Sequence, residues 1–155
     1  MEREPDIDAI TEAPPAAPVE ARELAAVFAG GFLGAIARAA PEHALAPAPG
    51  AWPWATFAVN VLAAGVLGFV VTWLGERHPR TMYARAFLAT GVCGALSTFS
   101  TVTVELIGLY EHASLGAACA YALASVAAGG CALVLGIRGA ERVPVRRRVA
   151  VEAEQ

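Results

Sequence analysis

The interpretation of the whole chain depends on residues 91–105, Gly-Val-Cys-Gly-Ala-Leu-Ser-Thr-Phe-Ser-Thr-Val-Thr-Val-Glu. They lie inside an apolar run that is long enough to cross a bilayer, yet glycine, serine and threonine crowd them. Hydroxyl groups contribute nothing against hydrocarbon and compete for backbone hydrogen bonds. Broken, polar backbone survives at membrane depth only where it is buried in protein or lines a water-filled path. By itself, the stretch leaves two interpretations open: close helix packing through small residues, or an ion pathway.

The composition is that of an integral membrane protein. Of the 155 residues, 57% are hydrophobic and 16% are charged, against about 25% charged residues in soluble domains, and the mean hydropathy is +0.54. Three runs contain no Asp, Glu, Lys or Arg, namely 54–74, 86–104 and 113–137. Each has the length of about 17–25 residues that a spanning helix needs. A fourth run, 24–40, is shorter and contains Arg38, which must snorkel or find a partner.

These runs predict an all-α membrane protein with four transmembrane helices and one membrane domain over residues 22–138. The expected helices are, approximately, 24–40, 54–74, 84–109 and 113–137. Residues 1–21 are rich in Pro, Ala and acidic side chains, which predicts a disordered tail and not a signal peptide. Residues 139–155 form a basic tail that we expect in the cytoplasm.

The reactive side chains suggest no enzyme. The cysteines lie in apolar runs without CxxC spacing, which predicts small buried residues, and the histidines fall at loops or helix ends, where we expect them to be solvated: Cys93, Cys119, Cys131, His43, His78 and His112. No nucleophile and base pair or metal cluster stands out. The sequence gives no reason to expect a nucleic-acid partner.

Three further motifs accompany the hydroxyl run. They are Gly30-Gly31-Phe32-Leu33-Gly34-Ala35 followed by Arg38, then Thr56-Phe57-Ala58-Val59-Asn60, and finally Tyr121 with Ser125. The order GGxxGAxxR, TxxVN, GxxSTFSTxxxE and YxxxS, in four helices, resembles the CrcB/Fluc fluoride channels over nearly all of residues 28–138.

That resemblance implies a fluoride-selective ion channel that lowers cytoplasmic fluoride by passive, voltage-driven efflux. It implies an antiparallel dimer, in which two subunits insert in opposite orientations, with a broken third helix and fluoride pathways along the interface. It also implies a structural sodium ion, not transported, that backbone carbonyls of Gly94 and Ser97 hold at the break.

The resemblance further implies a fluoride pathway of Asn60, Phe99, Thr101 and Ser125. The remaining motif positions are expected to support it: Arg38, Thr56, Thr98, Ser100, Val102, Glu105 and Tyr121. Fluoride is small and strongly hydrated, so amide N–H groups, hydroxyls and the positive edge of an aromatic ring must replace its water. Asn60 could instead form only a helix-helix hydrogen bond, Phe99 could be ordinary packing, and Arg38 could merely anchor a helix end. Val102 departs from the family pattern, which carries a second phenylalanine there.

Two other functions compete. A small multidrug-type exporter would need a carboxylate deep in a helix, whereas Glu105 closes an apolar run. A non-conducting or partner subunit of a heterodimeric channel would use Gly30 and Gly34 for dimer packing, and the valine at position 102 lends this some weight.

The basic residues predict orientation in the plasma membrane. With four helices, both tails and the loop after the second helix share one side, which carries every arginine except Arg38: Arg3, Arg22, Arg77, Arg80, Arg85, Arg138, Arg142, Arg146, Arg147 and Arg148. The positive-inside rule then places both termini in the cytoplasm. A chain locked in one orientation cannot easily supply both halves of an antiparallel pair, so a heterodimer with an oppositely oriented paralogue competes with a homodimer.

Overall fold

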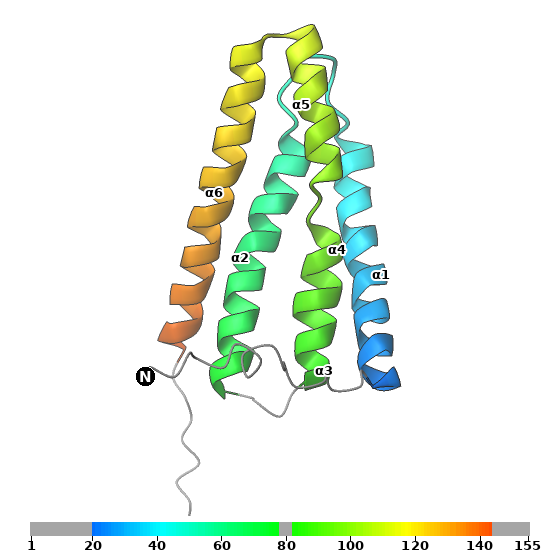
Figure 1. Ribbon diagram of the computed structural model, residues 1–155, viewed down its shortest axis with the longest axis vertical. Helices are drawn as coiled ribbons and strands as arrows, with labels where there is room; N and C mark the ends of the chain where they lie inside the picture. Colours follow the sequence, from blue (N-terminus) through cyan, green and yellow to red (C-terminus); the bar gives the residue numbers. More distant parts are fainter. Residues whose placement is uncertain (1–19, 78–81, 144–155) are drawn as a thin grey trace, which may run out of the picture.

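Four apolar helical rods stand side by side along one axis in the computed structural model, which describes residues 20–77 and 82–143 (Figure 1). Each rod is long and apolar enough to span a bilayer. In chain order the elements are α1 (Ala21–Ala44), α2 (Trp54–Arg77), α3 (Met82–Arg85), the π-helix η2 (Ala86–Cys93), α4 (Gly94–Leu96), α5 (Ser100–His112) and α6 (Leu115–Arg142). The predicted all-α fold with four long apolar helices is confirmed. The third rod consists of α3, η2, α4 and α5, and it is interrupted between α4 and α5.

The helix ends differ from the expected ones mainly in α1 and α6. α1 does not stop at residue 40 but continues through Pro41 to Ala44, and the Leu45 N–H donates to the Pro41 carbonyl at 2.9 Å. A proline costs little here because only one intrahelical bond is lost close to the helix end. α6 begins after Ser114, whose hydroxyl accepts the Ala117 N–H at 3.1 Å as an N-cap. It extends to Arg142, so residues 139–142 of the expected tail 139–155 are helical, as is Ala21 of the expected tail 1–21. Residues 1–19 and 144–155 of those tails lie outside the described residues.

Glycine lets the helices approach closely in two pairs, α1 with η2 and α2 with α6. A Cβ atom on Gly30 would lie 2.2 Å from the Phe87 carbonyl oxygen, and one on Gly34 would lie 2.3 Å from that of Val92. These contacts are within one chain. The alternative that Gly30 and Gly34 serve dimer packing is therefore wrong, because η2 already occupies that face of α1.

The outside of the bundle is apolar, as expected of a protein surrounded by lipid or by a partner chain. Large hydrophobic side chains are exposed along every rod, among them Phe28, Leu62, Val104, Leu123 and Leu135.

The cysteine prediction holds in part. Cys93 is buried, but Cys119 and Cys131 are exposed on α6, because a membrane helix can be apolar on its outer face as well as its inner one. His43 and His112 are exposed, as predicted, and His78 lies outside the described residues.

Candidate functional site

The break in the third rod is centred on residues 97–99. Ser97 adopts extended backbone angles, φ −79° and ψ 149°, so the helix of α4 ends there, and α5 starts at Ser100. Serine and threonine offer the backbone alternative hydrogen bonds, which makes this run a weak helix. A break at this depth leaves N–H and C=O groups without helical partners, and each must be satisfied by another group.

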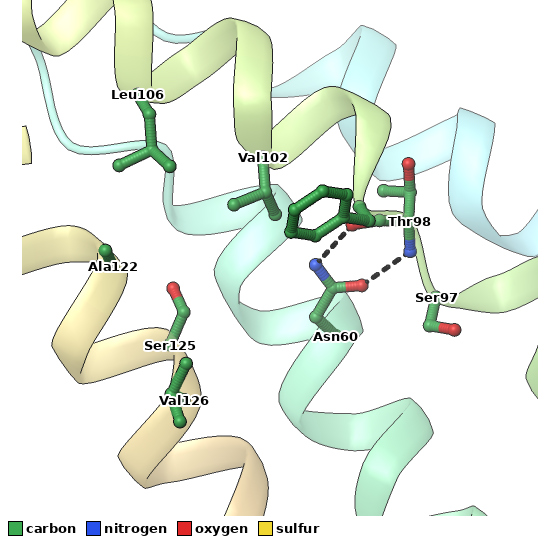
Figure 2. A pocket seen from close by; sticks show the side chains of 9 residues that line it. Asn60, Ser97, Thr98, Val102, Leu106, Ala122, Ser125 and Val126 are labelled. Carbon is green, nitrogen blue, oxygen red and sulfur yellow. Dashed lines mark hydrogen bonds between the residues drawn. The ribbon is translucent and has the colours of Figure 1, made fainter.

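Asn60 of α2 supplies two of those partners. Its Nδ2 donates to the Thr98 carbonyl at 3.0 Å, and its Oδ1 accepts the Thr98 N–H at 2.8 Å (Figure 2). In an unbroken helix the Thr98 N–H would donate to the Gly94 carbonyl. Asn60 therefore clamps the break, frees the Gly94 carbonyl, and keeps one amide hydrogen for another acceptor.

Thr98 in turn organises the start of α5. Its Oγ1 accepts the Thr101 N–H at 3.3 Å, and it lies 3.1 Å from the Thr101 hydroxyl and 3.2 Å from that of Ser100. This is N-capping by a threonine hydroxyl. The Thr101 N–H is the group that would otherwise bond the Ser97 carbonyl, so the Ser97 carbonyl is also freed from its helical donor.

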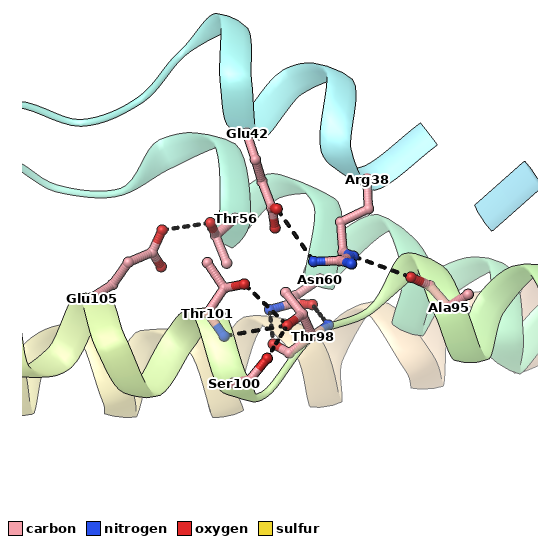
Figure 3. Close-up of polar contacts among 9 residues, drawn as sticks. All are labelled: Arg38, Glu42, Thr56, Asn60, Ala95, Thr98, Ser100, Thr101 and Glu105. Atoms are coloured by element: carbon pink, nitrogen blue, oxygen red, sulfur yellow. Dashed lines mark hydrogen bonds and ion pairs between the residues drawn. The ribbon is translucent and has the colours of Figure 1, made fainter. Parts of the chain in front are cut away.

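Arg38 reaches the break from α1. Its Nε donates to the Ala95 carbonyl at 3.3 Å, and its Nη1 forms an ion pair with Glu42 Oε2 at 3.3 Å (Figure 3). The end of a helix carries a partial negative charge that a cation stabilises. Arg38 is therefore more than an interfacial anchor, because it compensates the last turn of α4.

Glu105 lies inside α5, with seven residues of that helix still to come. Its carboxylate accepts hydrogen bonds from Thr56 Oγ1 at 2.5 Å and from the Tyr121 hydroxyl at 2.8 Å. Both partners are buried, and the ring of Trp52 packs edge-on against Tyr121 with centroids 5.3 Å apart. Glu105 closes the uncharged run 86–104 of the sequence but lies within the helix, as the expected span 84–109 implied, and two buried hydroxyls make an interior carboxylate tolerable.

A pocket of about 340 Å³ lies between α2, the break, α5 and α6 (Figure 2). Its wall combines a few polar groups with small and apolar side chains: Asn60, Ser97, Thr98, Phe99, Val102, Leu106, Ala122, Ser125 and Val126. Phe99 is 84% exposed. The Ser125 hydroxyl is buried and, among the described residues, lacks a hydrogen-bond partner of good geometry. The pocket thus combines the Asn60 amide and the Ser125 side chain with an aromatic ring.

Six of the thirteen sequence-predicted site residues line this pocket: Asn60, Ser97, Thr98, Phe99, Val102 and Ser125. Thr101 is the exception among the expected pathway residues, because its hydroxyl faces Thr98 and it does not line the pocket. Sequence reasoning missed Glu42, although its position four residues after Arg38 could have suggested an ion pair. For Asn60, the alternative of an interhelical hydrogen bond anticipated the contact with Thr98, but not that this contact lies at the helix break.

Any cation at the helix break would have to be bound by backbone oxygen atoms. Among the described residues, no cluster of three or more His, Cys, Asp or Glu side chains could hold a metal. The freed carbonyls of Gly94 and Ser97 offer neutral oxygen atoms, which are the ligands that hard cations prefer. Both residues are exposed within the single chain, so the residues present fit an ion bound at the chain's surface.

Comparison with known proteins identifies relatives along almost the whole membrane domain. The sequence model of the family described as "CrcB-like protein, Camphor Resistance (CrcB)" matches residues 25–137. "Fluoride-specific ion channel FluC 1" of Mycobacterium tuberculosis is 50% identical over 126 residues, which cover 81% of this chain and 96% of the relative. "Fluoride-specific ion channel FluC 2" of Leifsonia xyli is 36% identical over 132 residues, covering 83% and 90%. "Fluoride-specific ion channel FluC 3" of Streptomyces avermitilis is 38% identical over 130 residues, covering 84% and 63%.

Proposed function

This chain belongs to the CrcB family, and on that premise we propose that it forms a fluoride-specific ion channel in which the pocket beside the helix break is part of the ion pathway. It is a channel subunit and not an enzyme. The observation that carries the proposal is the pocket wall itself: the spare amide hydrogen of Asn60, the hydroxyl-bearing side chain of Ser125 and the exposed ring of Phe99 all border one space.

These groups suit a small anion. Fluoride must exchange its water for N–H, O–H and ring-edge donors, and each of the three residues offers one of them. The position of all three residues around one pocket favours a role of Phe99 in the pathway over simple packing. Val102 lies in the same wall and adds no donor, so the aromatic contribution from this chain rests on Phe99 alone.

Efflux through such a channel needs no energy source. Moving one charge across 100 mV is worth about 2.3 kcal/mol, so a membrane that is negative inside holds an anion at about fifty-fold lower concentration within. Fluoride that enters as the neutral acid therefore leaves through the channel as the anion.

A structural sodium ion at the break is the second part of the proposal. The Thr98 and Thr101 N–H groups are diverted to Asn60 and to the Thr98 hydroxyl. This leaves the Gly94 and Ser97 carbonyls available as ligands, without any charged side chain. The ion would hold the break open and would not be transported.

The third part is an antiparallel dimer. The residues exposed within the hydrophobic span of the third rod include Ser97, Phe99, Ser100 and Thr103. Three of these four carry hydroxyl groups, which are poorly suited to face lipid. A second subunit would cover them and close the open side of the pocket. Completing the sodium site from both chains would explain why Gly94 is exposed.

The arginines favour one orientation and hence a heterodimer. The described residues Arg22, Arg85, Arg138 and Arg142 are exposed and lie at the end of the bundle where α1 and α3 begin and α6 ends (Figure 1). This bias supports cytoplasmic termini in the plasma membrane and a paralogue in the opposite orientation. The numbered names of the relatives, FluC 1, FluC 2 and FluC 3, are compatible with organisms that hold more than one such chain.

Fluoride efflux from liposomes that contain this protein tests the proposal. Ion-selective electrodes should record fluoride release while chloride stays inside. Equal rates for the two halides would refute selective conduction. Release that begins only when a paralogue is added would instead identify the chain as a partner subunit.

A further inference from the structure

The Arg38–Glu42 pair is placed unlike an ordinary surface salt bridge. Arg38 already donates to the Ala95 carbonyl beside the break, and Glu42 binds the other end of the same guanidinium at 3.3 Å. The two side chains are 29% and 20% exposed, so the pair is largely sheltered. Glu42 therefore decides both where Arg38 points and how much of its charge is felt around it.

Helix stability does not explain Glu42. It occupies the last turn of α1, where the helix dipole disfavours a carboxylate. An Arg followed four residues later by Glu is also the less favourable order for an i,i+4 pair. In addition, Glu42 Oε1 is buried and has no hydrogen-bond partner among the described residues, which is costly for a charged group.

The Arg38–Glu42 pair is one of several polar contacts that lie side by side across the site. Arg38 contacts the chain two residues before Ser97, Asn60 clamps the next segment at Thr98, and Glu105 follows one turn after Thr101 on α5 (Figure 3). The other described arginines with placed side chains lie near the opposite end of the bundle. Within the described part of the chain, Arg38 is thus the cation of this half of the bundle.

We propose that Glu42 is a positioning residue that neutralises Arg38 and so limits how strongly the region of the helix break, which borders the pocket, attracts anions. The inference rests on the proposed fluoride conduction and adds a residue that sets its electrostatics. With Glu42 ionised, the pair has no net charge and its long-range field is small. With Glu42 neutral, one positive charge remains beside the break and raises the local concentration of fluoride.

The test compares Glu42→Gln with the wild-type protein in liposomes at low fluoride concentration. Glutamine keeps an oxygen that can accept from Arg38 but removes the charge. A charge about 10 Å from the ion changes its local concentration about two- to fourfold for an effective dielectric constant of about 80 to 40. We expect Glu42→Gln to increase efflux by that factor at about 0.01 M ionic strength, and to equal the wild type at about 1 M, where the screening length falls from about 30 Å to about 3 Å.

Glu111→Gln is the matched control. Glu111 is exposed near the end of α5 at the same end of the bundle, so its substitution removes the same charge from the same side. It should raise efflux less than Glu42→Gln does, because Glu111 is not paired with Arg38, and Glu42→Asp should behave as the wild type. The thermal unfolding midpoint of Glu42→Gln should be equal to or above that of the wild type, which a purely structural salt bridge would not allow.

Each other outcome counts against the inference. An unchanged or lower rate in Glu42→Gln at low salt, or an increase that persists at 1 M salt, overturns it. An equal increase in Glu111→Gln overturns the specific role of the pair. If the wild-type protein carries no fluoride, the proposed function fails and this inference with it, whereas wild-type conduction with an unresponsive Glu42→Gln refutes the inference alone.

Discussion

Replacing Asn60 with alanine should damage both the break and the conduction of fluoride. The substitution removes two hydrogen bonds, of 3.0 and 2.8 Å, and leaves the Thr98 N–H and C=O without their partner. Interhelical hydrogen bonds in membranes contribute about 0.6 kcal/mol each on average and at most about 1.7. Asn60→Ala should therefore lower the free energy of unfolding by about 1–3 kcal/mol, measured by denaturant titration in mixed micelles.

Fluoride efflux from liposomes should fall at least about tenfold in the same variant, because each loss of about 1.4 kcal/mol in the stabilisation of the passing ion lowers the rate tenfold. Asn60→Asp separates the two roles. It keeps the oxygen that accepts the Thr98 N–H, so stability should suffer less, but its carboxylate should repel fluoride and abolish efflux.

Thr103→Val is a control for unfolding of the single chain alone, since among the described residues the Thr103 hydroxyl bonds the Phe99 carbonyl one turn earlier, at 3.0 Å. It should change unfolding by no more than about 0.5 kcal/mol, the range of ordinary surface substitutions. The reasoning fails if Asn60→Ala unfolds within that same range and conducts at the wild-type rate.

Three other predictions concern the ion site, the packing and the orientation. A Cβ atom on Gly94 would meet no other atom closer than 4.0 Å within the chain, so Gly94→Val should leave the helix pairs intact yet abolish sodium-dependent efflux. Ser97→Ala should retain that efflux. Full activity in Gly94→Val would argue against the sodium site. Gly34→Ala should destabilise the protein by about 1–3 kcal/mol through overpacking, because its Cβ would lie 2.3 Å from a backbone oxygen, whereas Gly31→Ala meets open space and should be neutral or stabilising in the same unfolding titration. Cysteine labelling at the chain ends in intact cells should find both termini in the cytoplasm, and a substantial fraction of C-termini outside would contradict the one-orientation model.

The resemblance to fluoride channels named several residues that the structure brings together, but it did not predict the contacts that each of them makes. Asn60, Phe99 and Ser125 border one pocket, as that resemblance implied. Asn60, however, uses both atoms of its amide to hold Thr98, and Thr101 faces the cap of its own helix. These contacts depend on which neighbour each side chain meets, and a motif does not contain that information.

The sequence by itself determined the four spanning rods, because the length of an uncharged run is a local property. The cluster of hydroxyl side chains marked a weak helix, and the break there was implied by the family resemblance. Only the tertiary structure decided that Arg38 reaches Ala95 across 57 positions and pairs with Glu42, and that Glu105 lies between Thr56 and Tyr121. A membrane helix is apolar almost all round, so its periodicity does not reveal which face meets which neighbour. The rotation and depth of each rod are set by close glycine contacts, such as those of Gly30 and Gly34 with η2, and these exist only when the helices are packed together.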